Sequence, residues 1–93
     1  MNVNIACAGK EEAKRLLESI DRLGFTWPFG IRTTEHFPEA YKHDPEDLYV
    51  FHLDFDTKKI EMISYYIYLY NSMGDFNMTL ENFLKIRGEG TLK

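Results

Sequence analysis

The three histidines and their neighbouring carboxylates are the residues with which this chain could bind a metal ion. The candidates are His36, His43, Asp44 and His52. No two of them have the i, i+4 helical spacing typical of a zinc site, and the single cysteine leaves no second thiolate. The pattern favours surface histidines in an acidic region, and we expect neither a metal site nor a cofactor.

Cys7 and a histidine could form a nucleophile and its base. However, Cys7 falls on the apolar side of an alternating segment that also contains Val3 and Ile5. A free cysteine in such a position is usually a small buried hydrophobic residue, so we expect it to be inert. No other nucleophile–base pair or carboxylate pair has positional support, and we expect no enzyme. A small enzyme of unknown reaction therefore ranks third among the functions considered.

Two short groups could bind a phosphate-containing ligand. The junction Ala8-Gly9-Lys10 could present backbone N–H groups to an anion, although one glycine is more typical of a simple turn. Trp27 and Phe29 could stack on a planar ligand while Arg32, with His36 nearby, binds its phosphate. The alternative, which we favour, is that Trp27 covers the end of the first helix.

Four tyrosines within six residues are the most unusual feature of the sequence. They are Tyr65, Tyr66, Tyr68 and Tyr70. In a strand they would project to both faces, so one small core could not bury all of them. Tyrosine is enriched at protein interfaces, and we therefore favour an interface over a pure core role.

The negative charge of the chain belongs to one central segment. The net charge is −4, and seven acidic residues oppose one lysine between Glu35 and Asp56. Asp44, Glu46 and Asp47 lie at its centre. An acidic surface favours a cationic protein partner, and without clustered lysine and arginine general nucleic-acid binding is not expected.

The length and composition predict one small domain. At 93 residues we expect a single domain over 1–88 and a frayed tail over 89–93. One cysteine permits no internal disulfide and fits a reducing compartment. No apolar run has the length of a membrane span, and the first residues do not resemble a secretory signal. We therefore expect a protein of the cytoplasm, without membrane contact.

Hydrophobic periodicity predicts the first half of the fold. Residues 1–7 alternate as a strand with one buried face. Residues 10–23 form a helix whose apolar stripe includes Leu16, Leu17 and Ile20, and Gly24 suits the left-handed position after its end. A turn over 27–30 and a strand over 31–37 are expected to follow.

The second half is predicted to contain two strands and a helix. Residues 49–56 alternate between a core face, with Phe51 and Leu53, and a wet face with Val50, His52, Asp54 and Asp56. Residues 60–70 form a further strand, with helix as the competing prediction for the second half. The last helix begins at Thr79 as N-cap, with Met78 and Phe83 as a hydrophobic staple, and ends at Gly88.

The element order predicts an α+β fold. Strand, helix, three strands and helix are satisfied by a small antiparallel or mixed sheet of three to five strands. Both helices would then pack on one face of that sheet.

The chain resembles small uncharacterised accessory proteins of bacteriophages and prophages. The matching residues are Glu11-Glu12-Ala13, Leu23-Gly24-Phe25-Thr26-Trp27-Pro28-Phe29-Gly30, Asp75-Phe76 and Thr79-Leu80-Glu81-Asn82-Phe83-Leu84. They span most of the chain, which departs from the pattern in its long tyrosine-rich segment.

The resemblance implies a viral protein that acts in the host cytoplasm without chemistry of its own. Our first hypothesis is a binding protein that neutralises a host defence factor by protein–protein contact, as a homo-oligomer. The acidic segment would then meet a basic patch of the host protein. The alternative is an oligomeric sponge that sequesters a nucleotide immune signal in a pocket lined by Trp27, Arg32 and the tyrosines.

Overall fold

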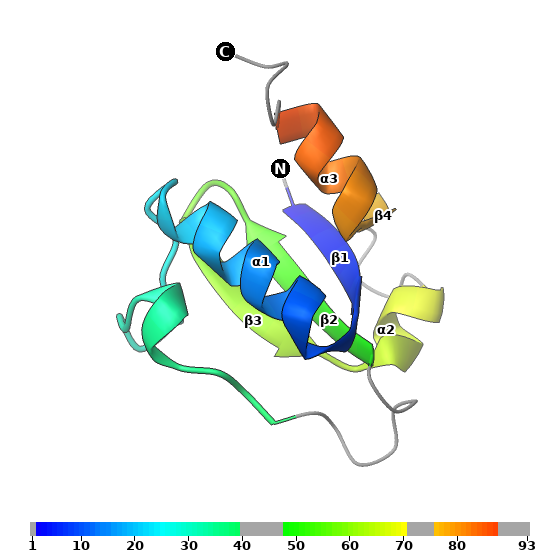
Figure 1. The fold of residues 1–93 in the computed structure, drawn as a ribbon, viewed down its shortest axis with the longest axis horizontal. Helices are drawn as coiled ribbons and strands as arrows, with labels where there is room; N and C mark the ends of the chain where they lie inside the picture. Colours follow the sequence, from blue (N-terminus) through cyan, green and yellow to red (C-terminus); the bar gives the residue numbers. More distant parts are fainter. Residues whose placement is uncertain (1, 40–47, 71–75, 88–93) are drawn as a thin grey trace.

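The computed structural model describes residues 2–39, 48–70 and 76–87 (Figure 1). Along the chain the elements are β1 (Asn2–Ala8), α1 (Gly9–Asp21), the 3-10 helix η1 (Thr33–Glu35), β2 (Leu48–Asp54), β3 (Lys59–Ile63), α2 (Tyr65–Tyr70), β4 (Phe76–Thr79) and α3 (Leu80–Arg87). The tail over 89–93 lies outside the described residues.

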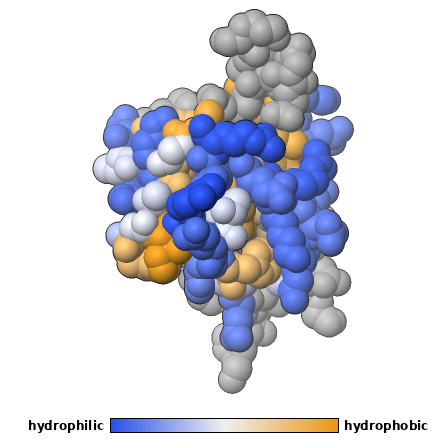
Figure 2. All heavy atoms as spheres, turned by 60° about the vertical axis from the view of Figure 1, so that its left-hand side comes forward, coloured by the Kyte–Doolittle hydropathy of each residue, from blue (hydrophilic) through white to orange (hydrophobic). Residues whose placement is uncertain are grey.

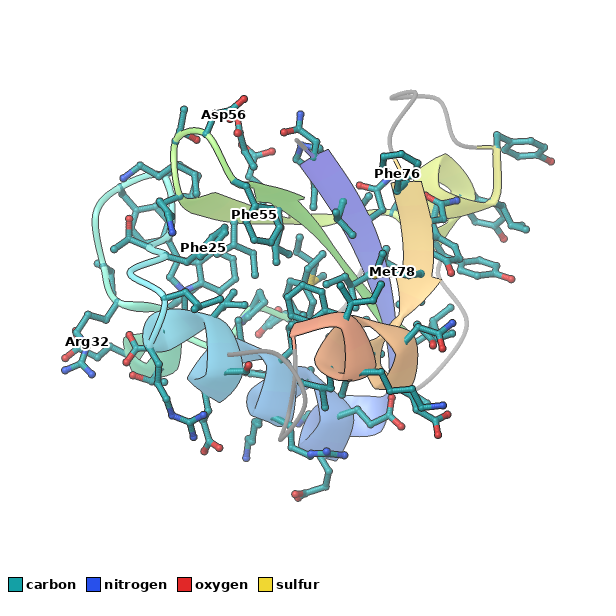
Figure 3. The ribbon with its side chains drawn as sticks, turned by 90° about the horizontal axis from the view of Figure 1, so that it is seen from above. Phe25, Arg32, Phe55, Asp56, Phe76 and Met78 are labelled. Atoms are coloured by element: carbon teal, nitrogen blue, oxygen red, sulfur yellow. The ribbon has the colours of Figure 1, made fainter. Side chains whose placement is uncertain are left out.

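The strands form one mixed sheet in the order β3-β2-β1-β4. β1 and β3 pair antiparallel with β2, whereas β4 pairs parallel with β1. Helices α1 and α3 lie together on one face of this sheet (Figure 3). The predicted α+β class, with a small mixed sheet and two helices on one face, is confirmed.

The core lies between that face and the two helices. The predicted stripe of α1 is buried, with Leu16, Leu17 and Ile20 at most 3% exposed. Next to the turn that joins β2 to β3, Phe25 and Phe55 point toward one another with ring centroids 5.1 Å apart (Figure 3). The other buried hydrophobic residues of the cluster are Val3, Ile5, Cys7, Ala13, Trp27, Tyr49, Phe51, Leu53, Ile60, Leu80 and Phe83.

The end of α1 matches its sequence signal. Gly24 has a φ of +92°, a left-handed conformation that glycine adopts without steric cost. Its N–H donates to the carbonyl of Asp21 at 3.1 Å, and the N–H of Phe25 donates to that of Ile20 at 3.2 Å. These two bonds form a Schellman motif, which turns Phe25 back into the core.

The predicted strand over 31–37 is wrong. Its first half forms an isolated bridge from Arg32 to Thr26 and then the single turn of η1. The side chain of Thr33 is buried and donates to the carbonyl of Leu17 at 2.7 Å. Because this bond and the ion pair of Arg32 with Asp21 tie the segment to α1, it cannot extend beside the sheet.

The predicted strand over 60–70 is correct only to Ile63, and the competing helical prediction holds for the remainder. Ser64 explains the change, because its Oγ accepts the N–H of Tyr66 at 3.2 Å and its carbonyl accepts the N–H of Tyr68. Ser64 therefore caps α2, a sequence signal that we did not use.

The wet face predicted for β2 is wrong at Val50, which is fully buried, and at His52, which is 7% exposed, whereas Asp54 is half-buried and Asp56 is exposed. In the register, Val50 lies between Ala6 and Ile63, and α2 packs against β2. His52 is covered as part of a hydrogen-bonded row described below. β4 was not predicted. The predicted N-cap of α3 at Thr79, the last residue of β4, is confirmed, because Thr79 Oγ1 accepts the N–H of Asn82 at 3.2 Å.

Candidate functional site

The predicted aromatic group at Trp27 forms, but it is a packed cluster. The ring of His36 meets those of Trp27 and Phe29 edge to face, with centroids 5.3 Å and 5.7 Å away. Trp27 is only 4% exposed, and its Nε1 has no hydrogen-bond partner among the described residues. A planar ligand could therefore reach Phe29, which is 60% exposed, more readily than Trp27.

Arg32 is engaged by α1. Its Nε and Nη2 donate to the two carboxylate oxygens of Asp21 at 3.2 Å and 2.8 Å, a bidentate pair. These bonds and the positive charge hold the pKa of Asp21 below its ordinary value, and Asp21 in turn raises the pKa of Arg32. The arginine predicted to bind phosphate thus already has a carboxylate on its guanidinium.

The centre of the predicted acidic site cannot be placed in the fold. Asp44, Glu46 and Asp47 lie outside the described residues, as does His43. At the ends of the acidic segment, Glu35, Glu39 and Asp56 are exposed.

The tyrosine segment is brought onto one short helix. The ring of Tyr65 contacts those of Tyr66 and Tyr68, with centroids 6.0 Å and 6.3 Å away. Burial raises the pKa of the Tyr68 phenol, whereas Tyr66 and Tyr70 are 47% and 76% exposed. The helix therefore divides its tyrosines between partly buried and open positions.

Open apolar side chains gather on α2 and β4. Among the described residues, the large hydrophobic side chains that are exposed are Phe29, Ile31, Tyr66, Leu69, Tyr70, Phe76 and Ile86. We define the α2–β4 surface as Tyr66, Leu69 and Tyr70 of α2 together with Phe76 of β4, which lies on the opposite face of the strand from Asn77. The first three recur at the i, i+3, i+4 spacing of one helix face. Asn77 joins the two elements, because its Nδ2 donates to the carbonyl of Tyr68.

The side of the molecule that carries the 22–39 segment contrasts with this surface. Figure 2 brings that side forward and shows hydrophilic side chains over most of it, with hydrophobic ones gathered toward one margin. Phe29 and Ile31 are the exposed large hydrophobic residues of that segment.

The two edges of the sheet differ in whether their backbone groups are hydrogen-bonded to another segment. The outer edge of β3 is occupied by Thr26, whose N–H donates to the carbonyl of Lys58 and whose carbonyl accepts the N–H of Ile60. Within the described part of the chain, no strand pairs with the outer edge of β4. Phe76 lies at the end of β4 away from α3, whereas Met78 lies over α3 (Figure 3).

A row of polar side chains crosses the other face of the sheet. The register aligns Glu61 on β3, His52 on β2, Asn4 on β1 and Asn77 on β4. Asn4 is fully buried. Its Oδ1 lies 2.8 Å from Nδ1 of His52, and its Nδ2 donates to Oδ1 of Asn77 at 3.1 Å.

The backbone carbonyl of Tyr68 fixes which side chain of this row donates and which accepts in each hydrogen bond. A backbone carbonyl can only accept, so Asn77 must present its amide N–H to Tyr68 and its oxygen to Asn4. Asn4 then presents its oxygen to His52, which must carry a proton on Nδ1. In the neutral imidazole, Nε2 is consequently the nitrogen without a proton.

A groove of about 280 Å³ lies beside His52 on this face. Its other lining residues are Pro28, Asp54, Thr57, Lys59 and Glu61. Lys59 donates to Thr26 Oγ1 at 2.9 Å, and Asp54 accepts the N–H groups of Asp56 and Thr57. Lys59 thus joins β3 to Thr26, and Asp54 stabilises the turn between β2 and β3. Sequence reasoning placed His52 and Asp54 on one face but missed the row, because the register with β1 and β4 was unknown.

No family model, curated protein or solved structure matches this chain. The expected relation to phage accessory proteins therefore stays a prediction, and the function is argued from the geometry of the chain's own residues.

Cys7 has the environment of a structural thiol. It is fully buried in the core, and this burial raises the pKa of its thiol to about 12. Because the thiolate is the nucleophilic form, Cys7 is unreactive near neutral pH. In the described ranges, no three His, Cys, Asp or Glu residues are grouped to hold a metal ion. No helix among those residues has the length and apolar character needed to span a membrane.

Proposed function

We propose that this chain is a non-enzymatic binding protein that acts by contact with another protein through its α2–β4 surface. The observation that carries the proposal is that Tyr66, Leu69 and Tyr70 are exposed on one face of α2 and Phe76 is exposed on β4, whose outer edge pairs with no strand among the described residues. Scattered exposed hydrophobic residues are normal on a protein surface, whereas a contiguous group, such as the three on one face of α2, marks an interaction site.

The residue types support this assignment. Tyrosine and phenylalanine offer a large contact area with few rotatable bonds, and tyrosine adds a hydroxyl group. The hydrogen bond from Asn77 to the carbonyl of Tyr68 holds α2 against β4, so the surface is ordered before a partner arrives. A preformed surface loses less entropy on binding.

The resemblance of the sequence to phage accessory proteins makes a host factor, such as a defence protein, the expected partner. The exposed acids Glu35, Glu39 and Asp56 favour a partner that also carries a basic region, away from its apolar contact. Neutralisation would follow from occlusion of a working surface of the host protein.

Sequestration of a nucleotide signal has less support. It would require Arg32 to leave Asp21 and a ligand to reach Trp27, which is 4% exposed. Arg32→Ala tests this alternative, because it should reduce nucleotide binding under the sponge hypothesis and leave protein binding intact under ours.

Removal of the apolar surface tests the proposal. A variant with Leu69→Ser and Tyr70→Ser should lose at least about 90% of the host proteins enriched on the immobilised wild-type protein, since two interface anchors lost cost well over 1.4 kcal/mol. The matched control is Phe29→Ser with Ile31→Ser, which removes two exposed hydrophobic residues elsewhere. Quantitative mass spectrometry of the bound proteins gives the result. Equal enrichment by all three proteins would contradict the proposal.

A further inference from the structure

We propose that the α2–β4 surface pairs with the same surface of a second copy of this chain. The two β4 strands would meet antiparallel about a two-fold axis, so that two four-stranded sheets become continuous. This inference rests on the proposed function, because it names one partner of the same protein-binding surface.

Among the residues that the structure describes, the edge of β4 lacks the features that normally protect an open strand. Proteins block such edges with charged side chains, proline, bulges or a covering segment. β3 shows these devices, because it carries Lys59 and Glu61 and is bridged by Thr26. β4 has the sequence Phe-Asn-Met-Thr, without charge or proline, and is paired regularly along its whole length with β1.

A second copy offers the matching edge. Antiparallel pairing of two identical strands lets each supply the N–H and C=O groups that the other lacks. A two-fold axis perpendicular to the sheet keeps each face on its own side. The helices α1 and α3 of both copies would share one side, and the polar rows that end at Asn77 would meet on the other.

The exposed area of the α2 residues on one side of β4 and of Phe76 on the other approaches what a dimer contact requires. Tyr66, Tyr70 and Phe76 are 47%, 76% and 66% exposed, which together equals about two whole aromatic side chains, or roughly 400 Å². Leu69, 52% exposed, adds to this area. A standard interface buries about 800 Å² per partner, and about 65% of a homodimer interface is apolar. The surface supplies most of the roughly 500 Å² that this fraction requires.

Charge also favours a second copy as the occupant. The chain carries a net charge of −4, so two copies repel one another unless they meet through an uncharged surface. The four residues of the α2–β4 surface are uncharged.

The test is a dilution series of the full chain followed by native mass spectrometry. We expect the wild-type protein to be dimeric, and Phe76→Lys to raise the dissociation constant at least tenfold by placing like charges near the two-fold axis. Phe29→Lys is the matched control, because Phe29 is 60% and Phe76 is 66% exposed. It should leave the dissociation constant unchanged. Far-ultraviolet circular dichroism verifies that each variant is folded, since Phe29 stacks on Trp27 and its replacement would change the tryptophan fluorescence directly. Leu69→Lys replaces Phe76→Lys if the latter does not fold.

A mixing experiment tests the two-fold arrangement. Phe76→Lys and isotope-labelled Phe76→Glu should each be largely monomeric alone and form a mixed dimer together. A wild-type chain that stays monomeric throughout, or a dimer that survives Phe76→Lys, would overturn the inference. If the chain is monomeric but loses host proteins when Leu69 and Tyr70 are replaced, self-pairing is refuted while the proposed function stands.

Discussion

At the scale of single residues, the polar row shows how a buried amide can link a sheet to a helix. Asn4 is fully buried and uses both ends of its amide, one toward His52 and one toward Asn77. Asn77 passes the connection to the carbonyl of Tyr68 in α2. The position of the helix that carries the exposed tyrosines therefore depends on a residue in the middle of β1.

Asn4→Ala should test this link. It leaves the Nδ1–H of His52 and the Oδ1 of Asn77 without their partner, which should lower the free energy of unfolding by about 1–3 kcal/mol. Amide hydrogen exchange should also become faster in α2. Asn82→Ala, at an exposed position of α3, is the control and should change neither quantity appreciably. Unchanged exchange in α2 for Asn4→Ala would show that the row does not hold the helix.

Cys7 should behave as a buried thiol. Alkylation should be negligible in the folded protein near neutral pH and rapid in urea. The thiol pKa is about 12 in the fold against an ordinary value of 9.0, so above pH 9 the unfolded chain releases a proton that the folded chain retains. This group therefore lowers the free energy of unfolding as pH rises from 9 toward 12, by about 1.4 kcal/mol per pH unit.

Comparison with Cys7→Ala isolates that contribution from the titration of other groups. Urea unfolding on either side of pH 9 should show the alkaline loss in the wild-type protein and a smaller loss in the variant. Because alanine fills less of the core than cysteine, Cys7→Ala should also lower the free energy of unfolding by about 1 kcal/mol near neutral pH. Equal pH dependence of the two proteins would contradict the assigned burial.

At the scale of elements, the sequence predicts structure well where one local signal dominates. The stripe of α1, the Gly24 termination and the Thr79 cap are all read from a few neighbouring residues. The segment over 31–37 is β-branched and aromatic, but bonds from Thr33 and Arg32 to distant parts of α1 decide its conformation. Such contacts are set by the tertiary fold and are not visible in a local pattern.

In the candidate site too, features set by neighbouring residues were predictable and features set by tertiary contacts were not. The tyrosines were identified from composition, and the alternation of β2 put His52 and Asp54 on one face. The row itself required the register of β1 with β2 and β4, which joins residues up to 73 positions apart. Ser64, by contrast, could have revealed the start of α2, because it immediately precedes the tyrosine segment and accepts the N–H of Tyr66.

The cap of α3 provides a prediction at this scale. Thr79→Ala removes the bond from the N–H of Asn82 and should cost about 0.5–2 kcal/mol of unfolding free energy. Thr79→Ser retains a hydroxyl and should recover most of this loss. Thermal unfolding followed by circular dichroism measures both variants. Equal destabilisation by alanine and serine would assign the effect to the lost methyl group of threonine.

At the scale of the whole molecule, the chain separates two kinds of surface. Helices α1 and α3 cover one face of the sheet and complete the core (Figure 3). Tyr66 and Tyr70 of α2 and Phe76 of β4 are exposed near the edge that pairs with no other described strand. The opposite edge, at β3, is closed by Thr26 and flanked by charged residues. This asymmetry is why we assign protein binding to the α2–β4 surface.

The most direct test of that assignment is hydroxyl-radical footprinting of the protein inside host cells, compared with highly diluted purified protein. Tyr66, Leu69, Tyr70 and Phe76 should be oxidised at least about threefold less in cells, because a bound protein chain excludes water from interface anchors. Phe29 and Ile31 serve as internal references and should be oxidised equally in both samples. Undiminished oxidation of the α2–β4 surface, or protection confined to Phe29 and Ile31, would contradict the account.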